Sequence, residues 1–328
     1  MSTIFFGIAD RTFVFDRTVG RAEFSGSGFR APMDLAVAPD GRIYVANRSW
    51  EYRPDGVRVT MLTIDEDYIG QFSSYGDGDG QLIWPSSVAV DSNQNVYVTD
   101  DHLNRVSVFD KDGQFLHKWG EAGSGDGQLN QPYCIRFDKE DNAYISDSGN
   151  NRIQKFSKDG RFMSKFGQQG SRAGELNLPW GITIDNDGNI LVADWRNDRI
   201  QKFSPDGQYL SDFGNTGTSV GQFRRPTGVA VDKDGDIYVA DWMNDRVQVF
   251  TGDARYVTTF LGEASLSKWG EEKLNSNPDM IRQRNMVQNK EAERRLWRPK
   301  AVAVDSEGRV IIVDSNRQRL QVYRKEVR

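Results

Sequence analysis

The sequence predicts an all-β fold, a single six-bladed β-propeller with four-stranded blades that spans residues 1–328. One pattern occurs six times: a proline, an alternating apolar run, a glycine turn, a second run, and an Asn/Asp-Arg step into a third run. The spacings between successive copies are 53, 47, 47, 47 and 73 residues, and the opening prolines are Pro32, Pro85, Pro132, Pro179, Pro226 and Pro299. A period near 47 residues with four short runs per copy is typical of one propeller blade per repeat.

Each copy is expected to supply four strands. In the third copy these strands are predicted at 134–138, 143–146, 152–156 and 161–166. Asp-Gly pairs such as Asp159 and Gly160 suit the tight turns of hairpins. Alternating Val, Ile, Tyr and Phe side chains suit strands that pack between neighbouring blades.

The two ends of the chain predict how the ring closes. The sixth copy stops after its third strand, at 319–323, and a strand-like segment at 11–20 precedes the first copy. We therefore expect the N-terminal segment to add the missing strand to the last blade, which removes exposed sheet edges. Trimming either end should open the propeller.

The amino-acid pattern of the repeat resembles that of NHL repeats over roughly residues 10–325. The clearest copy reads Pro179-Trp-Gly-Ile-Thr-Ile-Asp185, Asp187-Gly-Asn-Ile-Leu-Val-Ala-Asp194 and Asn197-Asp-Arg-Ile-Gln-Lys-Phe203. Propellers similar to these include peptidyl-hydroxyglycine lyases, RNA-binding modules of tripartite-motif proteins and sensor domains of bacterial kinases, and gluconolactonases are related rings. The resemblance implies the fold, but a fold shared this widely does not assign a function.

Composition excludes several classes of protein. A formal charge of −5 gives no general attraction to nucleic acid or to anionic membranes. No apolar run approaches the ~20 residues of a membrane helix, and Met1–Asp10 lacks the basic region of a secretory signal. The single cysteine, Cys134, excludes an internal disulfide and is interpreted as a buried structural thiol. A cytoplasmic location is expected.

Two positions hardly vary between the six copies. The second run closes with Asn47, Asp100, Asp147, Asp194, Asp241 and Asp314. The third run opens with Arg58, Arg105, Arg152, Arg199, Arg246 and Arg319. A carboxylate ring could be a metal or acid–base site, but a feature present in every blade is better explained as holding every blade. We expect the carboxylates to cap backbone N–H groups and to pair with the arginines.

The neighbouring positions differ from blade to blade and define a candidate site at the mouth of the central channel. The connections between second and third strands, and those between blades, emerge on this one face. The ligand-binding candidates are Arg48, Trp180, Trp195, Arg196, Trp242, Arg225 and Lys300. The catalytic candidates are His102, Asp101 and Tyr133, with His102 as the acid–base group because its intrinsic pKa lies near neutrality. The alternative is that Trp195 and Trp242 only pack between blades.

Two insertions open on the same face. Blade one has about six extra residues in 47–56, and the connection between blades five and six has about 26 extra residues within 262–298. Asn277 and Pro278 predict a helix start there. Six Lys/Arg against three Asp/Glu in 279–298 suggest a basic helical lid over an anionic ligand. The alternative is a solvated helix covering a blade edge.

The metal sites of the related families do not carry over readily to this sequence. The lyase branch holds a metal with three histidines, whereas this chain has only His102 and His117. The calcium site implied by the gluconolactonases could draw oxygens from Asp101, Asp147, Asp194, Asn104 and Asn151, but the repeat itself produces such clusters. No metal and no cofactor are predicted.

The sequence thus leaves three hypotheses about function. The first is a metal-independent lyase, isomerase or hydrolase, or a ligand binder, that takes a small anionic or aromatic molecule at the channel mouth. The second is a propeller that binds a protein or peptide through exposed Trp and Arg side chains. The third is an RNA-binding NHL module, which the acidic charge opposes.

Overall fold

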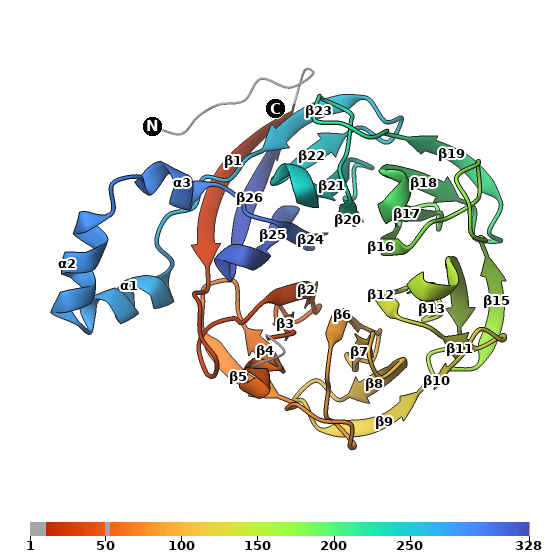
Figure 1. The fold of residues 1–328 in the computed structure, drawn as a ribbon, viewed down its shortest axis with the longest axis horizontal. Helices are drawn as coiled ribbons and strands as arrows, with labels where there is room; N and C mark the ends of the chain where they lie inside the picture. The colour runs from red at the N-terminus through yellow and green to blue at the C-terminus, as the bar shows by residue number, and fades with distance from the viewer. Residues whose placement is uncertain (1–10, 50–52, 328) are drawn as a thin grey trace.

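A computed structural model shows the predicted six-bladed β-propeller (Figure 1). The structure describes residues 11–49 and 53–327. Each blade is a four-stranded antiparallel sheet, with its first strand beside the central channel and its last strand at the rim (Figure 1). The six repeat prolines, which were predicted to open each copy, all begin the innermost strand of a blade.

The first three blades follow one another along the chain. Blade one contains β2 (Pro32–Val37), β3 (Ile43–Asn47), β4 (Arg58–Leu62) and β5 (Tyr68–Phe72). Blade two contains β6 (Pro85–Val90), β7 (Val96–Asp100), β8 (Arg105–Phe109) and β9 (Phe115–Trp119). Blade three contains β12 (Pro132–Phe137), β13 (Ala143–Asp147), β14 (Arg152–Phe156) and β15 (Phe162–Phe166). Between blades two and three lies a short parallel pair, β10 (Glu121–Ala122) and β11 (Gln128–Leu129).

The other three blades complete the ring. Blade four contains β16 (Pro179–Ile184), β17 (Ile190–Asp194), β18 (Arg199–Phe203) and β19 (Tyr209–Phe213). Blade five contains β20 (Pro226–Val231), β21 (Ile237–Asp241), β22 (Arg246–Phe250) and β23 (Tyr256–Phe260). Blade six contains β24 (Pro299–Val304), β25 (Arg309–Asp314), β26 (Arg319–Val327) and β1 (Arg11–Val19). Short 3-10 turns lead into third strands at η1 (Pro54–Gly56), η2 (Ser148–Asn150), η3 (Trp195–Asn197), η4 (Trp242–Asn244) and η5 (Ser315–Arg317).

Blade six is built from both ends of the chain, which confirms the predicted closure. β1 pairs antiparallel with β26, in a register that runs from Arg11 opposite Val327 to Val19 opposite Leu320. The closed blade is also tied to blade five, because the Lys325 ammonium lies 2.7–2.8 Å from carboxylate oxygens of three aspartates, Asp232, Asp234 and Asp236.

The nearly invariant aspartates hold the blades together, as predicted. In blade three the Asp147 side chain is fully buried; its Oδ1 accepts the backbone N–H of Asn130 at 2.6 Å, and its Oδ2 accepts Arg152 Nε at 2.7 Å. The same Asp–Arg pair recurs in three further blades as Asp194–Arg199, Asp241–Arg246 and Asp314–Arg319. These carboxylates therefore fix the loops that surround the channel mouth.

The long insertion forms three helices, α1 (Lys268–Asn275), α2 (Pro278–Met286) and α3 (Lys290–Arg294). Asn277 caps α2 as predicted, because its side chain accepts the backbone N–H of Asp279. Among the residues described, no helix is both long and apolar enough to span a bilayer.

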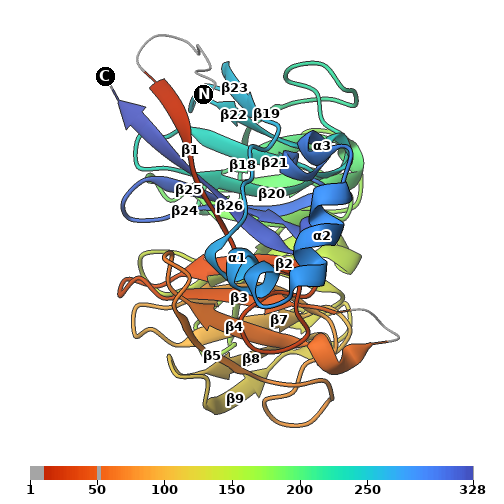
Figure 2. The same cartoon turned by 90° about the vertical axis from the view of Figure 1, so that its left-hand side faces the viewer.

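The prediction that this insertion forms a lid is wrong. The three helices lie outside the ring, beside blades six and one (Figure 1), and Figure 2 shows them against the outer side of the propeller. Trp269 of α1 is buried against Phe29 and Tyr68, with ring centroids 6.2 and 6.3 Å away. The Glu66 carboxylate accepts the backbone N–H groups of Gly20 and Lys268 and so fastens the insertion to the rim.

The positive charge of the insertion is largely neutralised where it lies. Arg282 pairs with Asp279, and Arg284 pairs with Glu293 at 3.2 Å. Arg294 and Arg295 both approach Glu291, at 3.6 and 3.1 Å. The insertion therefore matches the alternative interpretation, a solvated charged segment at a blade edge.

Candidate functional site

The residue after each repeat proline lies at the top of an innermost strand. These six residues are Met33, Ser86, Tyr133, Trp180, Thr227 and Lys300. Five of them line a narrow cavity in the channel, and Gly181, which follows Trp180, also lines it. The predicted convergence of this position around one mouth is therefore observed.

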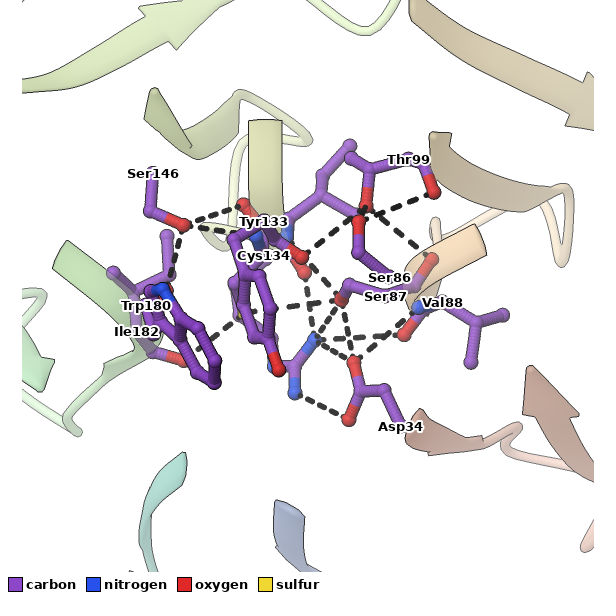
Figure 3. Close-up of polar contacts among 12 residues, drawn as sticks. Asp34, Ser86, Ser87, Val88, Thr99, Tyr133, Cys134, Ser146, Trp180 and Ile182 are labelled. Atoms are coloured by element: carbon purple, nitrogen blue, oxygen red, sulfur yellow. Dashed lines mark hydrogen bonds and ion pairs between the residues drawn. The ribbon is translucent and has the colours of Figure 1, made fainter. Parts of the chain in front are cut away.

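A buried polar network forms the floor of this cavity. Arg136 of blade three and Asp34 of blade one form a two-pronged ion pair, with N–O distances of 3.0 and 3.1 Å. Ser87 of blade two donates to the same carboxylate, and Figure 3 shows Asp34, Ser87 and Cys134 around this network. Because Arg136 also lines the next cavity along the channel, the network lies between the two cavities.

Cys134 belongs to this floor and is structural, as expected. Its side chain is buried, with Sγ 3.7 Å from the Ser87 hydroxyl and 3.8 Å from the carbonyl oxygen of Ile182. Burial raises the pKa of the thiol, which disfavours the nucleophilic thiolate.

One wall of the mouth is a stack of aromatic rings. Tyr133 lies on Trp180 with centroids 4.2 Å apart and an interplanar angle of 15°, and Trp180 lies on Trp195 at 4.6 Å and 12°. The Arg225 guanidinium, 4.8 Å from the Trp195 ring, continues the stack. Trp242 stands at a tilt to Trp180, with centroids 6.5 Å apart. Stacked rings of this kind form a rigid apolar wall beside the mouth.

Two cations from the start of blade six adjoin the Trp242 ring. Lys300 Nζ lies 4.7 Å from the ring centres of both Trp180 and Trp242, and the Arg298 guanidinium lies 4.8 Å from Trp242. Burial lowers the pKa of Lys300 to about 7; the charges of Arg48 and Arg298 act in the same direction, and that of Asp101 opposes them. Lys300 is thus poised between its charged and neutral forms near neutral pH.

An ion pair from blades one and two adjoins the aromatic wall. Arg48 Nη1 lies 3.0 Å from Asp101 Oδ2, and the same guanidinium covers the Trp84 ring at 4.5 Å. Burial raises the pKa of Asp101 to about 6, although the Arg48 charge acts in the opposite direction. Asp101 can therefore exchange a proton near neutral pH.

Five buried polar atoms around the mouth have no hydrogen-bond partner within the described part of the chain. They are Tyr133 Oη, Asp101 Oδ1, Trp195 Nε1, Trp242 Nε1 and Arg298 Nη1. Buried polar groups in folded proteins are normally paired, so a cluster of exceptions requires water or a ligand. Burial raises the pKa of Tyr133 well above its usual value, which keeps its hydroxyl a donor.

Two of the predicted residues contribute little to this cluster. His102 is exposed, and its ring contacts the edge of Trp84 at a centroid distance of 5.0 Å. Arg196 is also exposed and lies 5.9 Å from the Trp195 ring. Asp101, rather than its neighbour His102, acts electrostatically on Tyr133 of the aromatic wall.

Two further residues of the mouth, Trp84 and Arg298, were not predicted from the sequence. Both directly precede a repeat proline, at the position where Arg225 was selected. Comparison of this position across all six copies would have found them, since it reads Ala31, Trp84, Gln131, Leu178, Arg225 and Arg298.

Of the five residues proposed to supply oxygens to a calcium ion, all but Asp101 have those oxygens engaged in hydrogen bonds or ion pairs. Asn104 Oδ1 and Asn151 Oδ1 each accept a backbone N–H of the next blade, from Gln131 and Leu178, at 2.8 Å. Asp147 and Asp194 are fully buried and paired with arginines. No group of three or more His, Cys, Asp or Glu side chains in the described chain is arranged to hold a metal. These residues do not fit a calcium site.

Family models recognise parts of the chain. The NHL repeat model matches residues 176–203, 223–250 and 296–323, and a model described as a 6-bladed beta-propeller matches residues 82–155. The chain is a six-bladed propeller that contains NHL repeats. No protein with a curated description matches its sequence.

Solved structures share this fold at low identity. A streptogramin B lyase is 14% identical, with 97% of this chain and 98% of the lyase covered at a TM-score of 0.58. A gluconolactonase from Xanthomonas campestris is 14% identical, with 100% and 95% covered at a TM-score of 0.61. A protein of unknown function from Bacteroides thetaiotaomicron is 18% identical, with 96% and 76% covered at 0.65. Likenesses at this level establish the fold alone.

Proposed function

We propose that this NHL propeller binds a small anionic, planar molecule at the channel mouth and acts on it as a metal-independent lyase, isomerase or hydrolase. The observation that carries the proposal is the cluster of five buried, unpartnered polar atoms beside a stacked aromatic wall. A planar ligand that lies on the wall and accepts hydrogen bonds from Tyr133, Trp195, Trp242 and Arg298 would satisfy four of these atoms.

The charges of the mouth favour an anion. Arg48, Arg225, Arg298 and Lys300 surround the aromatic rings, whereas Asp101 is the carboxylate that reaches the cluster. The pKa of Asp101 is about 6 and that of Lys300 is about 7, so both groups can exchange protons near neutral pH, as an acid–base pair requires. Propellers of similar fold include a lyase and a gluconolactonase, so this architecture can support turnover.

A titration of tryptophan fluorescence with aromatic carboxylates and phosphates would test the binding site. Trp242→Phe retains the ring but removes the unpartnered Nε1, and should weaken binding about fivefold to tenfold, as expected for about 1 kcal/mol of hydrogen bonding. Trp297→Phe is the matched control, because Trp297 is 46% exposed and outside the stack. Equal affinities for both variants would contradict the proposed site.

Catalysis requires a separate test. Asp101→Asn should abolish turnover of any substrate that the screen identifies, while His102→Ala tests the acid–base role predicted for that side chain. Activity that survives the loss of both groups would remove acid–base chemistry from the proposal.

A peptide ligand is the second candidate. The helical insertion lies at the rim and leaves the mouth open, so the same wall could receive the side chains of an extended chain. In that case Trp195, Trp242 and exposed Arg196 would anchor the partner. A peptide display screen that enriches a common motif, together with no binding of small anions, would favour this candidate.

A further inference from the structure

Lys300 differs from the equivalent residues of the other five blades. It is the single charged side chain among the six residues that follow the repeat prolines. Within the described chain it makes no ion pair, and its surroundings are the faces of Trp180 and Trp242, each 4.7 Å from Nζ. A structural lysine would normally extend its ammonium group to water or to a carboxylate.

The charges around Lys300 disfavour its protonated form. Arg48 and Arg298 are the nearby cations, and Asp101 is the nearby anion. One oxygen of Asp101 is held by Arg48 at 3.0 Å, so this carboxylate is already shared. With burial added, the pKa of Lys300 falls to about 7, so the neutral amine is accessible near neutral pH. Desolvation among neighbouring cations is how proteins convert a lysine into a nucleophile.

A second group beside the same tryptophan can recognise a carboxylate. Arg298 lies 4.8 Å from the Trp242 ring, and its Nη1 is buried without a partner in the described chain. The Trp242 Nε1 is likewise buried and unpartnered. Two unused N–H donors next to an amine suit a molecule that has a carboxylate adjacent to a carbonyl group.

We propose that Lys300 is the nucleophilic amine of the mouth and forms an imine with the carbonyl carbon of a small 2-oxo acid. This inference rests on the proposed function, because it names the substrate class and the reacting atom of the same site. Arg298 and Trp242 bind the carboxylate, and the aromatic wall receives the rest of the molecule.

The reaction is a condensation and needs no oxidant. The Nζ lone pair attacks the carbonyl carbon, a C–N bond forms, and the carbonyl electron pair moves to the oxygen, which takes up a proton. The nitrogen loses a proton, and the resulting carbinolamine expels its hydroxyl group, with a second proton, as water. Asp101, whose pKa is about 6, is the group placed to give and take these protons. The iminium ion that remains withdraws electrons from the neighbouring carbon and so prepares lyase chemistry there.

Reductive trapping of the wild-type protein tests the inference. Pyruvate and sodium cyanoborohydride at pH 7, followed by peptide mass mapping, should attach one probe at Lys300 before the other lysines react. Exposed Lys233 is the internal reference; an ordinary lysine has about a thousandfold less neutral amine at this pH, so Lys300 should react about 100-fold faster or more. Acetone, which lacks the carboxylate, should label Lys300 more slowly than pyruvate, and Arg298→Met should reduce that difference.

The outcomes separate this inference from the proposed function. If Lys233 and other exposed lysines react while Lys300 does not, the imine is excluded. If aromatic anions still quench tryptophan fluorescence in that case, the proposed binding site is supported without an imine at Lys300. If they do not, both the binding site and the imine are excluded. Lys300→Met should lose the rapid labelling while it keeps the thermal unfolding transition of the folded propeller.

Discussion

Arg136 of the third blade and Asp34 of the first blade meet across the central channel in a two-pronged ion pair, with N–O distances of 3.0 and 3.1 Å. The two residues belong to blades that are not neighbours, so the pair braces the ring from inside. It also gives the mouth a polar floor, to which Ser87 of the second blade contributes a hydrogen bond.

Arg136→Met should lower the free energy of unfolding by about 3–5 kcal/mol, because it leaves the Asp34 carboxylate buried without its partner. The double variant Arg136→Met with Asp34→Leu should regain most of this loss. Urea unfolding measures the free energy of unfolding of the single and the double variant. Arg255→Met is the control, because Arg255 and its partner Asp253 are each 64% exposed and such pairs contribute about 0–1 kcal/mol. Equal losses for the two single variants would contradict the bracing role.

Asp101→Asn should change how stability depends on pH. The folded protein holds the Asp101 proton up to about pH 6, whereas the unfolded chain releases it near pH 3.9. Ionisation of Asp101 therefore weakens folding as the pH rises through this window, by up to about 3 kcal/mol. The variant should gain stability relative to the wild type between pH 4 and 6.5, whereas exposed Glu140→Gln should show no such trend in the same unfolding series.

Lys325→Met should open the closing blade. Burial acts to lower the pKa of Lys325, but hydrogen bonds to Asp232, Asp234 and Asp236 raise it above its usual value, so the ammonium is charged at neutral pH. Without it, carboxylates that are largely buried face one another, and we expect a loss of about 3–5 kcal/mol. Limited proteolysis should then cut near β1 and β26. Exposed Lys233→Met, in the same turn as Asp232, should leave the digestion pattern unchanged.

Removal of α2 should leave the mouth intact. Replacement of residues 277–289 by a short Gly-Ser linker takes away a helix with no buried residue, which lies at the rim. The melting temperature should stay within a few degrees, and ligand affinity should not change. Trp269→Ala should instead destabilise the protein, because that ring is buried against blade one. Weaker ligand binding after removal of α2 would restore the idea of a lid.

Most of the fold could be predicted because the sequence repeats itself. Each blade could be aligned with the others, so Pro132 marked the start of a blade and Asp147 a structural loop without any outside comparison. The strands predicted for blade three differ from the observed ones by at most two residues at either end. Closure by β1 followed from counting strands.

Comparison of the repeats could not predict how far from the channel axis the insertion and individual side chains lie. Strand polarity showed on which face the insertion leaves the blade, but not whether it turns inward or outward; Trp269 and Glu66 decide this through contacts with blade one. The pairing of Arg136 with Asp34 was equally hidden, since repeats aligned in sequence do not show which side chains meet across the channel. His102 was selected for its intrinsic chemistry, and its place beside Trp84 depends on a loop that differs from those of the other blades.

The pairing of β1 with β26 has a consequence during synthesis on the ribosome. Within the propeller, β1 is made before every other strand and its sheet partner β26 after every other strand, so at 5–20 residues per second β1 waits roughly 15–60 s for its partner. During that time five blades can form in succession, while β1 remains a free, partly apolar segment next to them. The nascent propeller therefore needs protection of its leading strand, and a translational pause late in the message would lengthen the interval in which two chains could exchange that strand.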